Sequence, residues 1–157
     1  MRKALIMLIA TFGVFAWAGP ASAVGRPQPK SPRRVVRAYV DDVNRGDAAA
    51  AASQFSHDAE LVTHLGSCTP CTGREVIQEK LAGAVGVQTH IAYTRLRVSK
   101  DEVTAASSLT SSNFPPGVTR AIGTFTATVR KGKLVRLVQE YDRSDPETAA
   151  LLAAVGG

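Results

Sequence analysis

The chain has 157 residues, of which 45% are hydrophobic and 20% are charged, and its formal net charge is +6. This length and composition predict one globular domain with a buried core. Most basic residues are interleaved with acidic ones, which is typical of a solvated surface, so we expect no nucleic-acid partner. The sequence shows no repeat period and no glycine-rich phosphate loop.

The first 23 residues have the pattern of a secretory signal peptide. Arg2 and Lys3 give a basic start, residues 4–18 form an uncharged apolar run, and small residues end the segment at Ala23. The apolar run is shorter than the roughly 20 residues that span a bilayer. We therefore expect cleavage after Ala23, a secreted or cell-envelope location and no stable membrane insertion afterwards. Because Arg2 and Lys3 would be lost, the charge of the remaining 134 residues (157 minus 23) would be +4.

Two helices are predicted at the start of the mature chain. Residues 24–31 are rich in proline and polar residues and predict a flexible lead-in. Residues 31–47 then predict an amphipathic helix, with Asp41 and Asp42 opposite its apolar stripe. Asp47 is expected to cap a second, short helix that depends on Phe55 for its anchoring. The apolar stripe of the first helix consists of Val35, Val36, Tyr39, Val40 and Val43.

A strand and a third helix are expected next. Following a turn at His57 and Asp58, residues 59–65 predict a strand, and both cysteines are placed in the loop after it. Thr72 has the position of a helix cap. The expected inward residues of the third helix are Val76, Ile77, Leu81 and Ala84.

From residue 88 the hydrophobic period changes from that of a helix to that of strands. Four strands are predicted, within residues 89–99, 103–113, 118–129 and 133–142. Their connections are short, so sequential neighbours are expected to pair antiparallel, with the helices covering one face of the sheet. This predicts an α+β fold. Residues 144–157 form a tail that could be a short helix beginning at Asp145-Pro146-Glu147.

The order of these elements resembles the nuclear transport factor 2-like superfamily, which includes SnoaL-like polyketide cyclases and ketosteroid isomerases. The resemblance covers residues 32–143 and is carried by YVDDVNRGD at 39–47, Phe55 with HDAEL at 57–61, GREVI at 73–77 and TFTATVRKGKLVRLVQEYD at 124–142. It implies a cone in which helices pack on a strongly curved, mostly antiparallel sheet around a pocket for a small apolar molecule. Many members are dimers, so a homodimer is one expectation.

The resemblance to ketosteroid isomerases also suggests where a ligand would bind. Tyr39 falls on the position of their tyrosine, whereas Thr63 and Gly123 fall on the positions of their two carboxylic residues. Proton transfer next to a carbonyl needs a base that a threonine cannot replace, so ketosteroid isomerase chemistry is not expected. Tyr39, Thr63 and Gly123 remain candidate ligand-binding residues. Tyr39 has an alternative role as a core residue with a satisfied hydroxyl.

Two further residues could form a non-standard acid/base set with Tyr39. His64 could accept a proton at neutral pH, although neighbouring strand residues face opposite sides, so that Thr63 and His64 should not both face the cavity. Glu140 on the last strand would have a raised pKa if it were buried without a partner. For both residues the commoner alternative is a solvated surface position.

Cys68 and Cys71 are close enough in sequence to pair without long-range rearrangement. In an exported chain, a disulfide is the default interpretation. A redox-active pair is an alternative, because the following helix start and Arg74 would lower the pKa of the Cys71 thiol. A zinc site would need two further ligands from the histidines. We expect a disulfide, and neither a bound metal nor a cofactor.

Together these features predict an exported single-domain protein that binds a small, partly apolar molecule. The alternatives are a SnoaL-like enzyme (an isomerase, cyclase, hydrolase or dehydratase) that uses Tyr39, His64 and Glu140, and a dimerising cell-envelope interaction module.

Overall fold

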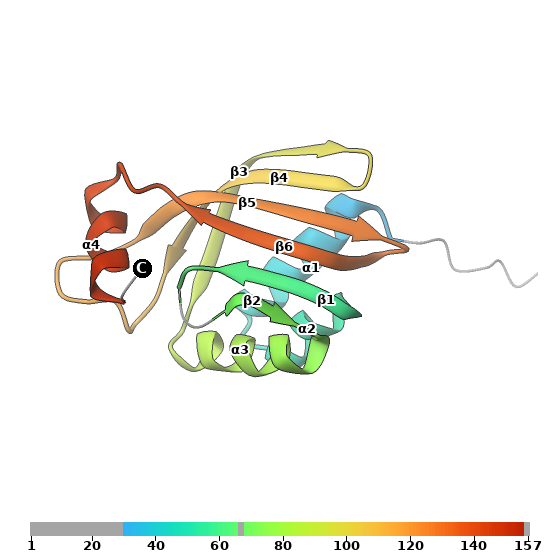
Figure 1. The fold of residues 1–157 in the computed structure, drawn as a ribbon, viewed down its shortest axis with the longest axis horizontal. Coiled ribbons are helices and arrows are strands. Elements are labelled where there is room, and N and C mark those ends of the chain that lie inside the picture. The colour runs from blue at the N-terminus through green and yellow to red at the C-terminus, as the bar shows by residue number, and fades with distance from the viewer. Residues whose placement is uncertain (1–29, 66–67, 156–157) are drawn as a thin grey trace, which may run out of the picture.

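The computed structural model describes residues 30–65 and 68–155 (Figure 1). The expected signal peptide and most of the lead-in lie outside the described residues. None of the helices in the described part is long and apolar enough to cross a membrane. The helices are α1 (Pro32–Asn44), α2 (Ala48–Ser53), α3 (Arg74–Gly86) and α4 (Pro146–Ala154). The strands are β1 (Phe55–Thr63), β2 (Cys68–Thr72), β3 (His90–Ser99), β4 (Glu102–Thr110), β5 (Ala121–Arg130) and β6 (Lys133–Tyr141).

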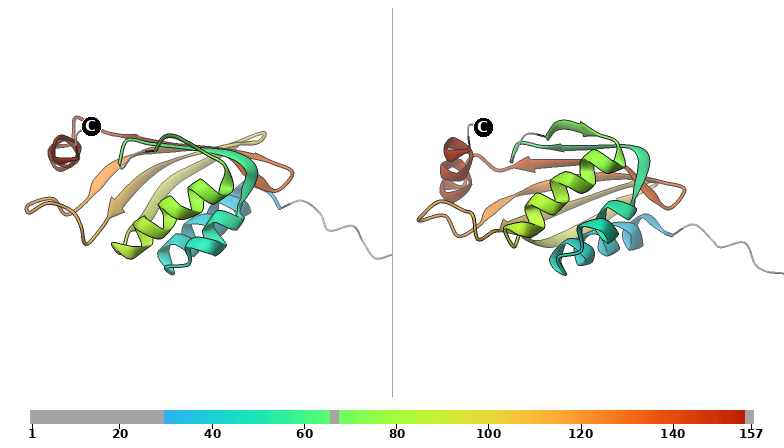
Figure 2. Two further views of the ribbon diagram at one scale, coloured as in Figure 1. Left: turned by 60° about the horizontal axis from the view of Figure 1, so that its bottom comes forward. Right: turned by 90° about the horizontal axis from the view of Figure 1, so that it is seen from below.

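The strands form one bent sheet in the order β2-β1-β6-β5-β4-β3. All neighbours pair antiparallel except β1 and β6, which are parallel, with Leu61 opposite Leu137. Helices α1, α2 and α3 cover one face of this sheet, and α4 lies apart from them at one end (Figure 2). The predicted α+β fold with a mostly antiparallel sheet is confirmed.

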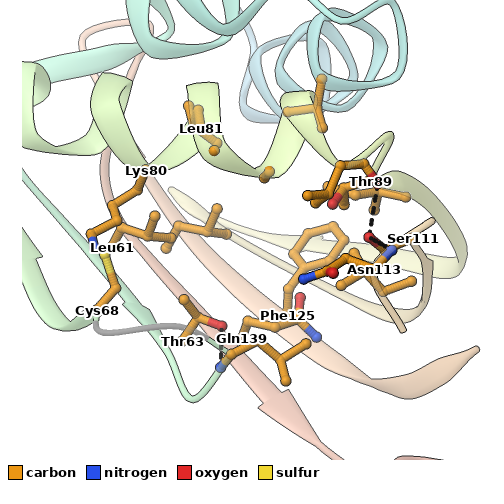
Figure 3. A pocket seen from close by; sticks show the side chains of 18 of the residues that line it. Leu61, Thr63, Cys68, Lys80, Leu81, Thr89, Ser111, Asn113, Phe125 and Gln139 are labelled. Atoms are coloured by element: carbon orange, nitrogen blue, oxygen red, sulfur yellow. Dashed lines mark hydrogen bonds between the residues drawn. The ribbon is translucent and has the colours of Figure 1, made fainter. Parts of the chain in front are cut away.

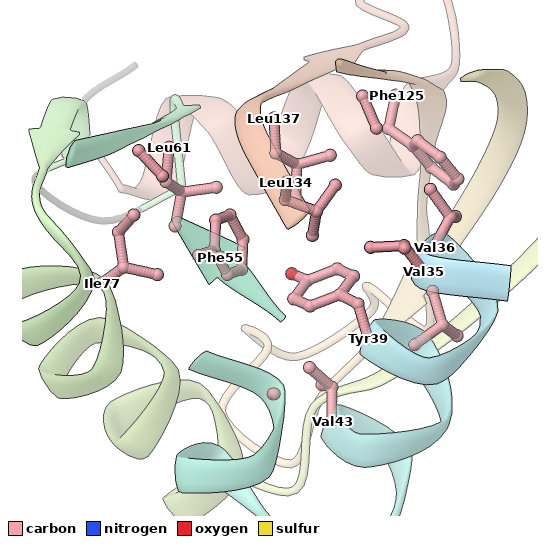
Figure 4. Packing of buried hydrophobic residues seen from close by; sticks show 14 of the residues in the cluster. Val35, Val36, Tyr39, Val43, Phe55, Leu61, Ile77, Phe125, Leu134 and Leu137 are labelled. Carbon is pink, nitrogen blue, oxygen red and sulfur yellow. The ribbon is translucent and has the colours of Figure 1, made fainter. Parts of the chain in front are cut away.

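The core lies between α1 and the sheet. The predicted apolar stripe of α1 is confirmed, because each of its five residues is at most 7% exposed. Figure 4 shows this stripe facing Phe55 of β1 and Leu134 of β6, which are opposite each other where the two parallel strands begin. Phe55 and Leu134 are fully buried. Each such side chain contributes roughly 1.5–3 kcal/mol by leaving water, so this layer fixes α1 on the sheet.

Asp42 was expected on the solvated side of α1, and this expectation is wrong. Its side chain is buried, forms an ion pair with Arg45 and accepts a hydrogen bond from Gln54 Nε2 at 2.9 Å. The carboxylate thus joins the end of α1 to the residue that follows α2. Its burial is possible because both oxygens have donors.

The region around the cysteines differs from the prediction in four ways. Strand β1 begins at Phe55, so His57 and Asp58 lie within it rather than in a turn. The expected cysteine loop contains a short edge strand, β2, that pairs with β1. Helix α3 is preceded by Gly73, whose φ of 94° favours glycine, and no side chain caps it. Val76 is 43% exposed instead of facing inward.

Candidate functional site

A cavity of about 490 Å³ opens between the sheet and α1 and α3 (Figure 3). In Figure 3, Leu81 on α3 faces Phe125 and Gln139 on the sheet across this space. At one end, the segment after β4 and helix α4 complete the wall. The apolar lining includes Val40, Val43, Leu61, Leu81, Ile91, Leu109, Phe114, Phe125, Leu137 and Leu151. Most of the lining is apolar, and its polar side chains are those of Tyr39, Thr63, Glu79, Lys80, Thr89, Ser111, Asn113, Gln139 and Tyr141.

One polar group of the lining is formed where β1 and β6 lie side by side. Thr63 is opposite Gln139 in the parallel pair, and Tyr141 follows two residues later on the same face. The hydroxyls of Thr63 and Tyr141 are hydrogen-bonded at 3.3 Å, and the Leu65 amide donates to the Thr63 hydroxyl. Burial raises the pKa of Tyr141 to about 12, against the smaller, opposite effect of the bond from Thr63. The Tyr141 phenol is therefore neutral at physiological pH.

Tyr39 presents a second phenol to the same cavity. Its ring is 7% exposed and packs edge-on against Phe55, with ring centres 5.4 Å apart. Figure 4 shows its hydroxyl pointing away from α1 toward the sheet. Within residues 30–65 and 68–155, no polar group hydrogen-bonds to this hydroxyl, and it is not sealed from the cavity. The ring thus belongs to the core, whereas the hydroxyl has no protein partner in the described residues.

Burial and the nearby Tyr141 both raise the pKa of Tyr39. A phenol with a raised pKa keeps its proton and can donate it in a hydrogen bond, but it is a poor base. The two tyrosines thus offer neutral donors to an acceptor oxygen such as a carbonyl or ether. Among the described lining residues the one carboxylate is Glu79, an exposed side chain on α3.

The side-chain amide of Gln139 is committed to the sheet. Its Nε2 donates to the Ser107 hydroxyl at 3.0 Å and lies within 3.4 Å of two backbone carbonyls. At the other end of the cavity, the Ser111 hydroxyl donates to the Val87 carbonyl at 2.9 Å. These polar groups therefore stabilise the wall, whereas the Tyr39 hydroxyl is available to a ligand.

The structure separates the candidate residues that the sequence brought together. Tyr39 and Thr63 line the cavity, but His64 is exposed in the turn after β1 and lies outside the lining. Gly123 and the exposed Glu140 line a different, more open hollow of about 730 Å³. In the described residues, Tyr39, His64 and Glu140 thus share no cavity, and no acid/base set forms from them.

Gly123 has a structural reason to be glycine. A Cβ at this position would lie 1.9 Å from the backbone oxygen of Glu140, far inside van der Waals contact. The close approach of β5 and β6 therefore excludes any side chain at the position that the resemblance assigns to a carboxylic acid.

Tyr141 is a cavity residue that the sequence reasoning did not single out. The signal was present, because Leu137, Gln139 and Tyr141 alternate along the last strand and Leu137 is a core residue. Residues that alternate with a core position share its face, so Tyr141 could have been placed in the cavity.

Cys68 and Cys71 form a disulfide within β2. Both residues are buried, and Cys68 contributes to the cavity wall. Among the described residues, no group of three or more His, Cys, Asp or Glu side chains is arranged to hold a metal ion. The disulfide thus closes the wall next to α3.

Comparison with known families decides the classification. The family model of the SnoaL-like domain matches residues 36–137. The chain belongs to the SnoaL-like domain family. The expected resemblance is thereby confirmed, and the match includes the whole of α2, α3 and β1 to β5. No curated protein matches the sequence.

Solved structures share the fold of this SnoaL-like chain at low sequence identity. The epoxide hydrolase/cyclase-like enzyme SalBIII, described as having a role in pyran ring formation in the polyether salinomycin, is 22% identical, with a TM-score of 0.63 over 73% of this chain and 92% of its own. A hypothetical protein with a ketosteroid isomerase-like fold from Catenulispora acidiphila, in complex with trimethylamine, is 20% identical, with a TM-score of 0.63 over 81% of this chain and 95% of its own. An NTF2-like protein from Cytophaga hutchinsonii is 11% identical, with a TM-score of 0.62 over 76% and 96%. These likenesses establish the fold alone.

Proposed function

We propose that this SnoaL-like protein is exported and binds a small, partly apolar molecule in its cavity, with Tyr39 donating a hydrogen bond to an acceptor oxygen of the ligand. The observation that carries the proposal is the unpartnered hydroxyl of Tyr39 beside a mostly apolar cavity of about 490 Å³. Because the hydroxyl is open to the cavity and has no protein partner in the described residues, a ligand acceptor can bond to it without breaking an intramolecular hydrogen bond.

The size and lining of the cavity support a small organic ligand. Pockets for such ligands usually have volumes of about 300–1,000 Å³ and combine apolar walls with a few polar groups that fix orientation. One structural neighbour, from Catenulispora acidiphila, was solved with a small molecule, trimethylamine. The two cavity phenols are neutral donors, which favours a neutral ligand with a carbonyl or ether oxygen next to them, whereas the charged lining residues Glu79 and Lys80 both lie on α3.

The side chains support ligand binding without the proton transfer between carbon atoms that a ketosteroid isomerase catalyses. Thr63 and Gly123 occupy the positions of the two carboxylic residues, and Gly123 lies outside the cavity. Both cavity phenols have a raised pKa and so do not act as bases near neutral pH.

Export is supported by the leader pattern in residues 1–23 and by the disulfide. Thiols stay reduced in the cytosol of most organisms and pair outside it, so a buried Cys68–Cys71 disulfide fits an exported chain. Expression of the full gene followed by N-terminal sequencing tests this. We expect an extracytoplasmic protein that begins at Val24; a cytosolic chain that retains residues 1–23 would refute export.

The binding proposal is tested with a matched pair of probes. Butyrophenone carries a carbonyl next to an aromatic ring, and butylbenzene has the same apolar parts without the carbonyl. We expect isothermal titration calorimetry to show saturable binding of the ketone that Tyr39→Phe weakens roughly 2- to 13-fold, the equivalent of one hydrogen bond.

Two controls accompany this measurement. Tyr93→Phe removes a phenol that faces Phe125 but does not line the cavity, and it should leave ketone affinity unchanged. Butylbenzene should bind wild type and Tyr39→Phe equally. Absence of saturable ketone binding, or an equal loss in both tyrosine variants, would overturn the proposal.

A further inference from the structure

Helix α4 follows the segment that matches the SnoaL-like domain, which ends at residue 137. It begins at Pro146, and the side chain of Asp145 caps it by accepting from the Thr148 amide at 2.9 Å. Figure 1 shows α4 beyond the end of the sheet, next to the connection between β4 and β5. The helix thus adds a wall that the matched segment does not contain.

A set of hydrogen bonds holds α4 against the start of β5. One oxygen of Glu147 accepts from the amide and the hydroxyl of Thr119, at 2.6 and 2.8 Å, and from the Arg120 amide at 3.2 Å. Thr148, fully buried, accepts from the Ile122 amide at 2.9 Å and donates to Asp145 at 2.8 Å. These bonds fix the position of α4 relative to the sheet.

Two adjacent leucines of α4 are equally buried but face different surroundings. Leu151 and Leu152 are each 2% exposed. Leu151 lines the cavity, whereas Leu152 does not. The helix therefore directs one large apolar side chain at the ligand space, and the next residue provides a natural control.

Leu151 and Tyr39 line the same cavity from different elements, α4 and α1. Tyr39 packs on Phe55, which is opposite Leu134 at the beginning of β6. Helix α4 follows the end of β6 at Tyr141. A ligand that is bound to the Tyr39 hydroxyl and points toward α4 would reach Leu151, because both residues line this cavity.

We propose that α4 is a fixed end wall of the cavity and that Leu151 sets the maximum length of the ligand. This inference depends on the proposed ligand binding at Tyr39. It identifies the ligand class further, as a neutral molecule with an acceptor oxygen at one end and an apolar extension of limited length. Leu151→Ala removes about three carbon atoms from the wall and would admit a correspondingly longer extension.

The test uses straight-chain alkyl phenyl ketones of increasing length, from acetophenone to decanophenone, titrated into the purified protein. In the wild type, affinity should rise roughly fourfold for each added methylene while the chain enters the cavity, and then stop rising. In Leu151→Ala, the length at which affinity stops rising should increase by about two to three carbons. In Leu152→Ala, that length should remain at the wild-type value.

A second variant keeps the test informative if Leu151→Ala does not fold. Leu151→Phe extends the side chain further into the cavity, so the chain length at which ketone affinity stops rising should decrease. Circular dichroism verifies that this variant is folded. If the chain length at which affinity stops rising is unchanged in both Leu151 variants, or changes equally in Leu152→Ala, the inference is overturned while ligand binding stays intact. Failure of every ketone to bind the wild type would instead refute the proposed function.

Discussion

The replacement of Tyr39 by phenylalanine distinguishes a ligand-binding hydroxyl from a structural one. The substitution keeps the aromatic ring and its edge-on contact with Phe55 and removes only the hydroxyl. Because that hydroxyl has no hydrogen-bond partner in residues 30–65 and 68–155, no intramolecular bond is lost there. We therefore expect the free energy of unfolding to stay within about 0.5 kcal/mol of wild type or to increase.

Tyr141→Phe is the matched control, because the same atom is removed from a phenol that does have a partner. The Tyr141 hydroxyl is bonded to Thr63 at 3.3 Å. Losing this bond should lower the free energy of unfolding by about 0.5–1.5 kcal/mol. Tyr39→Phe should thus be the more stable variant.

Both variants are measured by urea denaturation followed by far-ultraviolet circular dichroism, with calorimetric titration of butyrophenone on the same samples. The account expects Tyr39→Phe to lose ligand affinity without losing stability. A stability loss in Tyr39→Phe as large as that in Tyr141→Phe would refute the reasoning, because it would show that the Tyr39 hydroxyl is bonded within the fold.

Three further predictions concern a close contact between two strands, the disulfide and the docking of α4. Gly123→Ala should lower the free energy of unfolding by about 1–3 kcal/mol, because the new Cβ would overlap the backbone of β6. Gly83→Ala, in open space on α3, should instead raise the free energy of unfolding by about 0.5–1 kcal/mol. Urea midpoints in the opposite order would contradict this. Reduction of the Cys68–Cys71 disulfide should lower the free energy of unfolding by about 2 kcal/mol, because the disulfide limits the entropy of the unfolded chain. An unchanged urea midpoint in reductant would count against a stabilising disulfide. The pKa of Glu147 lies below its ordinary 4.5, because the donors from Thr119 and Arg120 favour the carboxylate. The contribution of Glu147 to α4 docking is therefore present above pH 4.5 and is lost as the pH falls through the lowered pKa. Hydrogen exchange of residues 146–154 should therefore accelerate more than that of β5 at about pH 3 after correction for intrinsic rates, and equal protection would contradict the role of Glu147.

The parts of the fold that depend on local periodicity could be predicted from the sequence. The α1 stripe was identified because its spacing repeats with the helical period, and the last four strands because their period is two. Strand β2 was not predicted, because a short edge strand is stabilised by pairing with β1 rather than by an apolar pattern of its own.

The site was predicted less completely, because it depends on contacts between distant segments. The placement of Tyr39 and Thr63 followed from the family resemblance. The parallel pairing of β1 with β6, which places Thr63 opposite Gln139 and next to Tyr141, joins residues far apart in the chain. Likewise, the burial of Asp42 depends on Gln54 after α2, and a helical projection of α1 alone cannot show that partner.

The central claim is that the Tyr39 hydroxyl binds a ligand inside the cavity, and a crystal structure of the complex with butyrophenone tests it most directly. The account predicts the ketone between α3 and the sheet, with its oxygen about 2.5–3.0 Å from the Tyr39 hydroxyl. A ketone bound elsewhere, with the Tyr39 hydroxyl bonded to a protein group, would contradict it.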